Sequence, residues 1–516
     1  MRLMRTTATT LATLLTVSLG TALVAPTAGA ADTPSATGDG ATAQERAEAK
    51  EALAVAESAV AGTSVAGDAG RQAPDVTMAM RDLFVAKHAL RGADRASAER
   101  LLARPTTPPD DPDDPRDIYY GPDADLQSQC AATYCLHWVE EGEHAATPAF
   151  AAEAFDTIGD VARVYAEAGY RAPLPDAGQE GDIRTDFYLG DIDTYGALGF
   201  CRSDADGPVD GSAWYAYCGF DNDYASSPWL DPTSLLRVTV AHEYFHAIQY
   251  AYDAEDDGWI YESTAMAMED ELYDDVNDNV FYLNYGQMGD PEAFGYPAGP
   301  SVPLDVSDLN AYGNWGFWRY LMEQHPRTAG GLPTIMRDVW EALDTTRGAA
   351  PTTSLQALDR VLQARRTSTP DEYAGFADAN QHPADAYEEG AEQAYPTAPN
   401  TLASLQLAKK KRIGTHRARL DHLTSATGEV LPFPGSKFLT VAVDLDDATA
   451  QRAVVTVHRV DGTTSTTPLR VNRKGKGVTI VPFAPARVAS VEVTLTNGST
   501  RGQDALAADV GYLAVG

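Results

Sequence analysis

The sequence contains only four cysteines in 516 residues, and none of them forms a Cys-x-x-Cys pair. This scarcity argues against a zinc site built from thiolates, whose usual signature is that pair. The four cysteines fall into two local pairs, Cys130 with Cys135 and Cys201 with Cys218. Because short loops close at little entropic cost, we expect each pair to form a disulfide.

Basic residues are also in short supply. The chain has 39 Lys and Arg against 74 Asp and Glu, which gives a formal net charge of −35. We therefore expect no basic groove and no nucleic-acid partner. Some of the acidic side chains could bind calcium, although the sequence contains no EF-hand loop.

No hydrophobic run is long enough to cross a membrane. An apolar stretch from Leu11 to Val24 follows Arg2 and Arg5 and precedes the small residues of Ala28–Ala30. This order is typical of a signal peptide, here residues 1–30, that is removed on export. We therefore expect a secreted, extracellular protein without a membrane span, which also suits paired cysteines.

Changes in composition divide the rest of the chain, and the first part covers residues 31–117. It combines a leader of small residues, helical patterns over Glu45–Ala61 and Asp75–Leu102, and a Pro/Asp run from Asp110 to Pro115 that cannot pack. The interpretations are a helical N-terminal domain or a propeptide. The linker has few apolar groups, so we expect this part to be separable from the rest.

Residues 118–400 have the composition of a globular domain that mixes helices and strands. Strand patterns cover Arg184–Leu189 and Gly211–Phe220, and helical patterns cover Phe150–Ala168, a segment that begins at Asp231 and Pro232, Trp259–Leu272, Trp315–Glu323, Pro333–Leu343 and Leu355–Arg365. Residues 401–516 instead show short strand patterns separated by turns, which predict an all-β sandwich. The basic run Lys409–Arg412 at its start could contact an anionic cell-surface polymer.

The segment His242–His246 reads HEYFH and matches the HExxH pattern. On a helix, residues four apart share one face, so His242 and His246 can reach the same ion. Zinc suits neutral imidazole and keeps a position open for water, from which Glu243 can take a proton. The alternative is two ordinary histidines on a polar face. Apolar neighbours indicate a partly buried helix, where two histidines and a glutamate without a partner would be costly.

Such a site needs a third protein ligand. A metzincin would continue with glycine at position 249 and histidine at 252, but the sequence has Gln249 and Tyr252. Glu262, on the next predicted helix, is the leading candidate. Three other carboxylates remain as alternatives: Asp253, Asp256 and Glu269.

Two side chains are candidates for supporting roles. Glu269 returns to nearly the same helix face as Glu262 two turns later, where it could orient a ligand from behind. Tyr312 precedes an aromatic-rich helix and could stabilise the oxyanion that develops on a substrate. The alternative for Tyr312 is an ordinary core tyrosine.

The segments HEYFHAIQY, from His242, and WIYESTA, from Trp259, resemble the gluzincin-type metallopeptidases, which use HExxH and a downstream glutamate. They are most similar to an uncharacterised group of secreted bacterial metalloprotease-like proteins with AHE-aromatic-FHAIQ and W-x-x-E-[ST]-x-A segments. The resemblance covers roughly residues 134–380, including YGNWGFW from Tyr312. It does not extend to a substrate.

The resemblance implies an α+β zincin-like catalytic domain, with a helical active-site core and a mixed sheet. It further implies that His242, His246 and Glu262 bind one zinc ion and that Glu243 is the general base. With the sandwich that follows, the chain is predicted to be a secreted zinc peptidase acting on a protein or peptide substrate. The alternatives are a polymer-binding or adhesion protein with a structural zinc, and a zinc hydrolase of non-peptide bonds.

Overall fold

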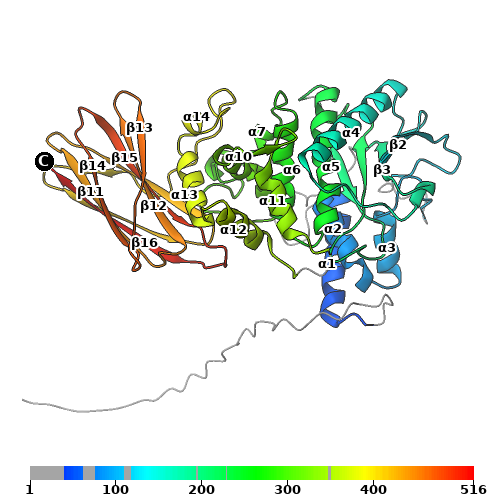
Figure 1. Ribbon diagram of the computed structural model, residues 1–516, viewed down its shortest axis with the longest axis horizontal. Coiled ribbons are helices and arrows are strands. Elements are labelled where there is room, and N and C mark those ends of the chain that lie inside the picture. The colour runs from blue at the N-terminus through cyan, green and yellow to red at the C-terminus, as the bar shows by residue number, and fades with distance from the viewer. Residues whose placement is uncertain (1–39, 62–75, 110–117, 193–195, 228, 347–349) are drawn as a thin grey trace, which may run out of the picture. The chain divides into compact units, whose positions relative to one another are not determined.

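The computed structural model describes residues 40–61, 76–109, 118–192, 196–227, 229–346 and 350–516 (Figure 1). The expected signal peptide over residues 1–30, most of the leader that follows it and the Pro/Asp run from Asp110 to Pro115 lie outside the described residues. Within the described part, no helix has the length and apolarity needed to cross a membrane.

A mixed sheet lies beside the helix that carries the HEYFH motif. Its strand order is β1 (Gln127–Cys130), β2 (Tyr134–Trp138), β3 (Thr185–Gly190), β5 (Tyr217–Asp221) and β4 (Gly199–Arg202). Strands β2, β3 and β5 are parallel, whereas β1 and β4 are antiparallel to their neighbours at the two edges. β3 and β5 are buried along their whole length, as expected for parallel strands covered on both faces.

Helices pack on this sheet and on one another. α5 (Pro232–Tyr252) contacts β4, β5, α4 (Pro148–Ala168) and α6 (Gly258–Leu272). The other short elements of this region are η2 (Gln179–Gly181), α7 (Asn279–Tyr282), α8 (Pro291–Phe294), α9 (Leu309–Gly313), α10 (Trp315–Gln324), β6 (Thr328–Ala329), β7 (Leu332–Pro333), α11 (Thr334–Leu343), α12 (Ser354–Ala364), α13 (Thr369–Ala379) and α14 (Pro383–Ala386). The helices predicted for this region correspond to α4, α5, α6, α10, α11 and α12, and their bounds agree to within about two residues.

Two predicted elements are shorter in the structure because the chain turns within them. Only Tyr217–Asp221 of the expected strand Gly211–Phe220 forms a strand. Asp210 and Ala213 instead pair across a turn in which Gly211 has a φ of +60°. The expected helix Asp75–Leu102 is likewise divided into α2 (Val76–Ala86), η1 (Lys87–Ala89) and α3 (Ala93–Leu101), with Gly92 at a φ of +57°.

The N-terminal helices α1 (Ala43–Val60), α2 and α3 share one hydrophobic core with the sheet and its helices. Met80, Leu83 and Phe84 on α2 have no exposed surface. The Phe84 ring lies 5.0 Å from that of Trp214 and 5.3 Å from that of Tyr250. Arg104, just after α3, forms buried ion pairs with Asp176, Asp186 and Asp204. The described part of residues 31–117 is therefore not loosely held, whereas its removal as a propeptide stays a prediction.

The C-terminal region is rich in strands and has a second hydrophobic core. One sheet has the order β13 (Thr464–Pro468), β12 (Gln451–Arg459), β15 (Val488–Asn497), β10 (Thr424–Leu431) and β8 (Leu405–Gln406). The other has the order β14 (Lys476–Pro482), β11 (Phe438–Leu445), β16 (Leu506–Val515) and β9 (Ile413–Leu420). Alternate residues of both sheets, such as Val455 and Val441, fill the core between them.

Both disulfides join neighbouring strands of the mixed sheet. Cys130 and Cys135 face each other across β1 and β2 and are bonded, as are Cys201 and Cys218 across β4 and β5. These are the pairs expected from their spacing. Each bond ties an antiparallel edge strand to the rest of the sheet.

We predict that Phe84→Ala destabilises the whole region around the sheet. Truncation leaves a cavity between α2 and α5 and should lower the free energy of unfolding by about 3–5 kcal/mol. Urea unfolding of the full chain measures the change in the first transition. Phe294→Ala is the matched control, because Phe294 is 46% exposed. Equal midpoints for the two variants would show that the N-terminal helices do not stabilise this core.

Candidate metal centre

The HEYFH segment lies in the middle of a helix whose start follows from local sequence. The Asp231 side chain accepts a hydrogen bond from the Ser234 backbone nitrogen at 3.1 Å, and Pro232 occupies the first turn. From Val238 to Tyr252 every residue of α5 is buried. The helix therefore carries His242, Glu243 and His246 into the interior, where each polar atom needs a partner.

Helix α6 packs against α5 and brings Glu262 to the two histidines. His242 Nε2 lies 3.1 Å from Glu262 Oε2, and His246 Nε2 lies 3.5 Å from Glu262 Oε1. All three residues are buried, and one donor atom from each lies within 4.8 Å of the others. His242, His246 and Glu262 can therefore hold a metal ion.

The spacing of these donor atoms suits a tetrahedral ion. Zinc binds nitrogen and oxygen ligands at roughly 2.0–2.1 Å, which places two ligands of a tetrahedron about 3.4 Å apart. The two measured separations, 3.1 and 3.5 Å, are close to that value. In addition, buried His246 Nε2 and Glu262 Oε1 have no hydrogen-bond partner among the described residues. A bound cation would satisfy both atoms.

The other ring nitrogen of each histidine, Nδ1, contacts the side-chain oxygen of a neighbouring residue. His242 Nδ1 lies 2.6 Å from Glu269 Oε1, and His246 Nδ1 lies 2.6 Å from Gln249 Oε1. When each Nδ1–H donates to its oxygen, the lone pair of Nε2 faces the centre, which is the arrangement of a metal-binding imidazole. Glu269 thus lies where the sequence analysis expects an orienting residue.

Gln249 is a supporting residue that the sequence analysis did not assign. Its side-chain nitrogen donates to Tyr261 O at 3.0 Å and to Thr264 Oγ1 at 2.9 Å, so the amide orientation is determined by α6. Its position three residues after His246, on a neighbouring part of the same helix face, is the feature of the sequence that could indicate this role.

Buried charges shift the pKa values at the centre in different directions. Burial lowers the pKa of His246 to about 4. Burial opposes a charge on His242 too, but hydrogen bonds to Glu262 and Glu269 raise its pKa well above the ordinary value. Burial raises the pKa of Glu269 to about 7. At Glu262, burial is outweighed by the charge of His246 and the hydrogen bond to His242, and its pKa is lowered. These shifts favour a negatively charged Glu262 that faces the imidazoles of His242 and His246.

Glu243 lies beside the centre and against the edge strand β4. A Cβ atom at Gly199 would lie 2.7 Å from Glu243 Cγ, so the strand approaches this closely only because position 199 is glycine. The disulfide sulfur of Cys201 lies 2.9 Å from the Glu243 backbone oxygen. Strand β4 and the catalytic candidate are therefore in direct contact.

Tyr312, on α9, also lies at the centre. Its ring is nearly parallel to that of His242, with an interplanar angle of 10° and a centroid distance of 6.1 Å. A hydrogen bond from Tyr312 contributes to the lowered pKa of Glu262. The tyrosine is only partly buried, which differs from an ordinary core position.

The alternative ligands Asp253 and Asp256 lie outside this group. Asp253 accepts a hydrogen bond from the Glu255 backbone nitrogen at 2.9 Å, and Asp256 accepts from the Ser354 backbone nitrogen at 3.1 Å. Burial raises the pKa of Asp253 to about 6 and that of Asp256 to about 7. Both carboxylates stabilise the loop between α5 and α6.

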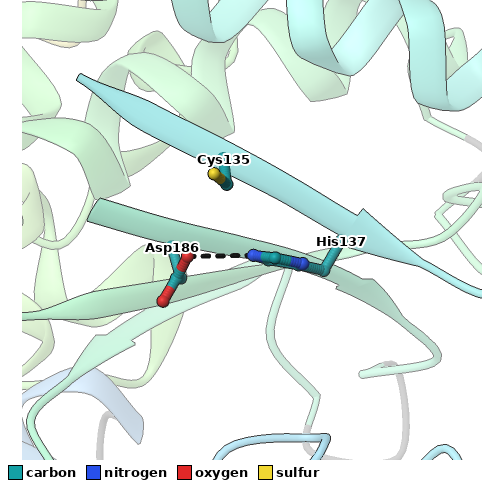
Figure 2. Close-up of side chains that lie close together, drawn as sticks. All are labelled: Cys135, His137 and Asp186. Atoms are coloured by element: carbon teal, nitrogen blue, oxygen red, sulfur yellow. Dashed lines mark hydrogen bonds and ion pairs between the residues drawn. The ribbon is translucent and has the colours of Figure 1, made fainter. Parts of the chain in front are cut away.

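His137, on strand β2 of the mixed sheet, lies in a structural environment (Figure 2). His137 Nε2 lies 2.9 Å from Asp186 Oδ1, and His137 Nδ1 lies 2.8 Å from Ser128 Oγ. Cys135 is nearby, but its sulfur is bonded to Cys130 and is no thiolate ligand. Since both ring nitrogens have partners, His137 stabilises the sheet.

Comparisons with known proteins give only weak similarities. No family model matches the chain, and no curated protein matches it. Among solved structures, an aminopeptidase N family protein from Idiomarina loihiensis is 11% identical over 76% of this chain and 69% of that chain, with a TM-score of 0.27. The pre-peptidase C-terminal domain of a collagenase from Bacillus anthracis is 9% identical over 23% of this chain and 97% of that chain, with a TM-score of 0.17. Similarities at these scores establish neither fold nor activity.

We predict that Gln249→Met weakens metal binding. Methionine has a similar size but cannot accept the Nδ1–H of His246, and loss of such a contact typically costs 10–100-fold in metal affinity. Competition with a chromogenic zinc chelator measures the affinity. Gln451→Met, which removes an equally buried glutamine from the C-terminal region, should leave it unchanged. Equal affinity in Gln249→Met and the unmodified protein would rule out the orienting role.

Proposed function

We propose that the protein is a secreted zinc-dependent peptidase. The observation that carries this proposal is the convergence of His242, His246 and Glu262 next to Glu243, with both imidazoles oriented from behind. Two nitrogen ligands and one carboxylate form a typical catalytic zinc set with a position left for water. Two disulfides and the expected signal peptide support an extracellular location.

Glu243 is proposed as the general base. Zinc in such a set supplies an acidified water and polarises the carbonyl of the substrate. Glu243 follows its histidine directly and lies beside the ligand face, so its carboxylate can accept the proton of the attacking water. The same carboxyl group can then donate that proton to the leaving amine. Glu269 and Gln249 keep the two imidazoles in place during this transfer.

A peptide is the proposed substrate because two histidines four residues apart on a helix, with a glutamate directly after the first, form the zinc-binding and base-supplying set of metalloproteases. The proposed contact of Lys409–Arg412 with a cell-surface polymer stays a prediction.

Two substitutions should separate the base from the ligand. Glu243→Gln keeps the shape of the side chain but cannot accept the proton, so peptide hydrolysis should fall by roughly 10²–10⁴-fold with zinc still near one per chain at this centre. Glu262→Ala removes a ligand, so the zinc at this centre should be lost. Atomic emission gives the zinc content, and mass spectrometry of a digested peptide library gives the activity.

Glu271→Gln is the control for both variants, because Glu271 lies on α6 but pairs with Arg319 at 3.8 Å. It should retain zinc and activity. Retention by Glu262→Ala of the full zinc content of the unmodified protein would move the third ligand elsewhere, with Glu269 the next candidate. Undiminished hydrolysis by Glu243→Gln would refute the proposed function.

Tyr312→Phe tests the proposed oxyanion donor. Loss of one such donor typically lowers kcat by about 10²–10³-fold, and here zinc should be retained. The hydrogen bond between Tyr312 and Glu262 allows a different result, in which zinc binds more weakly but the loaded enzyme turns over normally. That result would reject the oxyanion role and make Tyr312 a positioning residue. Tyr320→Phe, on α10, is the matched control.

A further inference from the structure

A second group of metal-binding side chains lies where the turn after α13 meets the five-stranded C-terminal sheet. His382 is the N-terminal capping residue of α14, His458 lies on β12 and Glu492 lies on β15. One donor atom from each residue lies within 4.8 Å of the other two. The peptidase chemistry proposed above uses none of these residues.

Strand alternation directs two of these side chains to the same face. Val457 and Val491 are part of the C-terminal core, so the neighbouring residues His458 and Glu492 point to the opposite face of their sheet. Glu492 is opposite Thr456 in the antiparallel register of β12 and β15, which makes it a diagonal neighbour of His458.

Helix α13 covers this face and positions His382. The helix contacts both β12 and β15 (Figure 1). Its Asp378 carboxylate accepts hydrogen bonds from Thr456 Oγ1 at 2.7 Å and from Thr466 Oγ1 at 3.1 Å. The chain then leaves the helix and brings His382 over Glu492.

The distances within the group are too long for direct hydrogen bonds. His458 Nε2 lies 3.6 Å from Glu492 Oε2, and His382 Nε2 lies 4.0 Å from Glu492 Oε1. Asp378 Oδ1 adds a further oxygen 3.9 Å from His382 Nε2. The four residues thus surround one point without satisfying one another.

Three buried atoms of the group have no hydrogen-bond partner among the described residues: His382 Nε2, His458 Nε2 and Glu492 Oε1. Glu492 is only 8% exposed. An uncompensated carboxylate oxygen at this depth is costly, as is a buried imidazole nitrogen without a partner. Because the three atoms converge, a single cation would satisfy all of them.

The donor set selects the kind of cation. Two imidazoles with carboxylate oxygens suit a divalent transition metal such as zinc, whereas calcium and magnesium prefer oxygen alone. The separations exceed the roughly 3.4 Å edge of a zinc tetrahedron, so the imidazoles must move inward. The side chains of His382 and His458 are 14% and 26% exposed, which leaves room for this movement and an entry path from solvent.

We propose that His382, His458 and Glu492 form a second metal site for a divalent ion of the zinc class, with Asp378 as a fourth donor. The ion would join the turn after α13 to β12 and β15 and thereby stabilise the contact between the helices and the C-terminal sheet. The competing arrangement is a pair of protonated histidines beside Glu492, which binds no metal.

Zinc stoichiometry of the full-length chain tests this site separately from the first. The metal-free protein is equilibrated with zinc, freed of excess ion and analysed by atomic emission. We expect two zinc ions per chain in the unmodified protein, one in Glu492→Gln, one in Glu262→Ala and none in the double variant. His422→Asn is the control: His422 pairs with Asp305 and Asp504 outside the cluster, and this variant should keep two.

A second measurement covers the case in which Glu492→Gln does not fold. Cobalt(II) added to the Glu262→Ala chain should give one equivalent of tetrahedral visible absorption, and His458→Asn in that background should abolish it. One zinc per chain in the unmodified protein, lost in Glu262→Ala and retained in Glu492→Gln, would overturn the second site and leave the first intact. If Glu492→Gln loses the zinc and Glu262→Ala retains it, the first site would be overturned instead.

Discussion

The burial of helix α5 is the constraint on which the site depends. Its HEYFH segment has no exposed face, so His242, Glu243 and His246 must all be compensated inside the protein. Helix α6 provides that compensation on one side through Glu262 and Glu269, and strand β4 closes the other side at Gly199. The packing that buries the helix therefore also orients each imidazole.

The parts of this arrangement that depend on neighbouring residues could be predicted from the sequence. The cap of α5 involves only residues close in the chain: the Asp231 side chain accepts from the backbone nitrogen of Ser234, three residues later. The four-residue spacing of the two histidines likewise places them on the same face of the helix. Glu269 could be placed relative to Glu262 for the same reason. The proximity of α5 and α6 is predicted by the HExxH motif together with the resemblance to gluzincin-type metallopeptidases. The expected fold class agrees with the structure in having helices, a mixed sheet and a strand-rich C-terminal region.

Long-range contacts were beyond sequence reasoning. Nothing near Gly199 indicates that β4 touches Glu243, because the contact joins residues on a strand and a helix that are far apart in the chain. The N-terminal helices were expected to be separable because their linker is polar, yet the apolar side of α2 is what decides their packing. Arg104 adds to this attachment: it pairs with Asp204 at 2.9 Å, with Asp176 at 3.0 Å and with Asp186. Such a buried network is costly to break, because removing one partner leaves a charge uncompensated.

The chain has almost twice as many acidic as basic residues. The basic residue that faces each buried carboxylate therefore indicates whether that carboxylate belongs to an ion pair or to a metal site. Where the partner is arginine, as at Arg104 and at Arg319 beside Asp270, the charge is permanent and no lone pair is left for a metal. Where the partner is histidine, the outcome depends on its two nitrogens. At His137 both have partners, and the cluster is structural. At His246 and at His458, Nε2 has no hydrogen-bond partner among the described residues and faces a glutamate that is likewise short of one. That combination is what separates the two candidate metal sites from the ordinary ion pairs of an acidic protein.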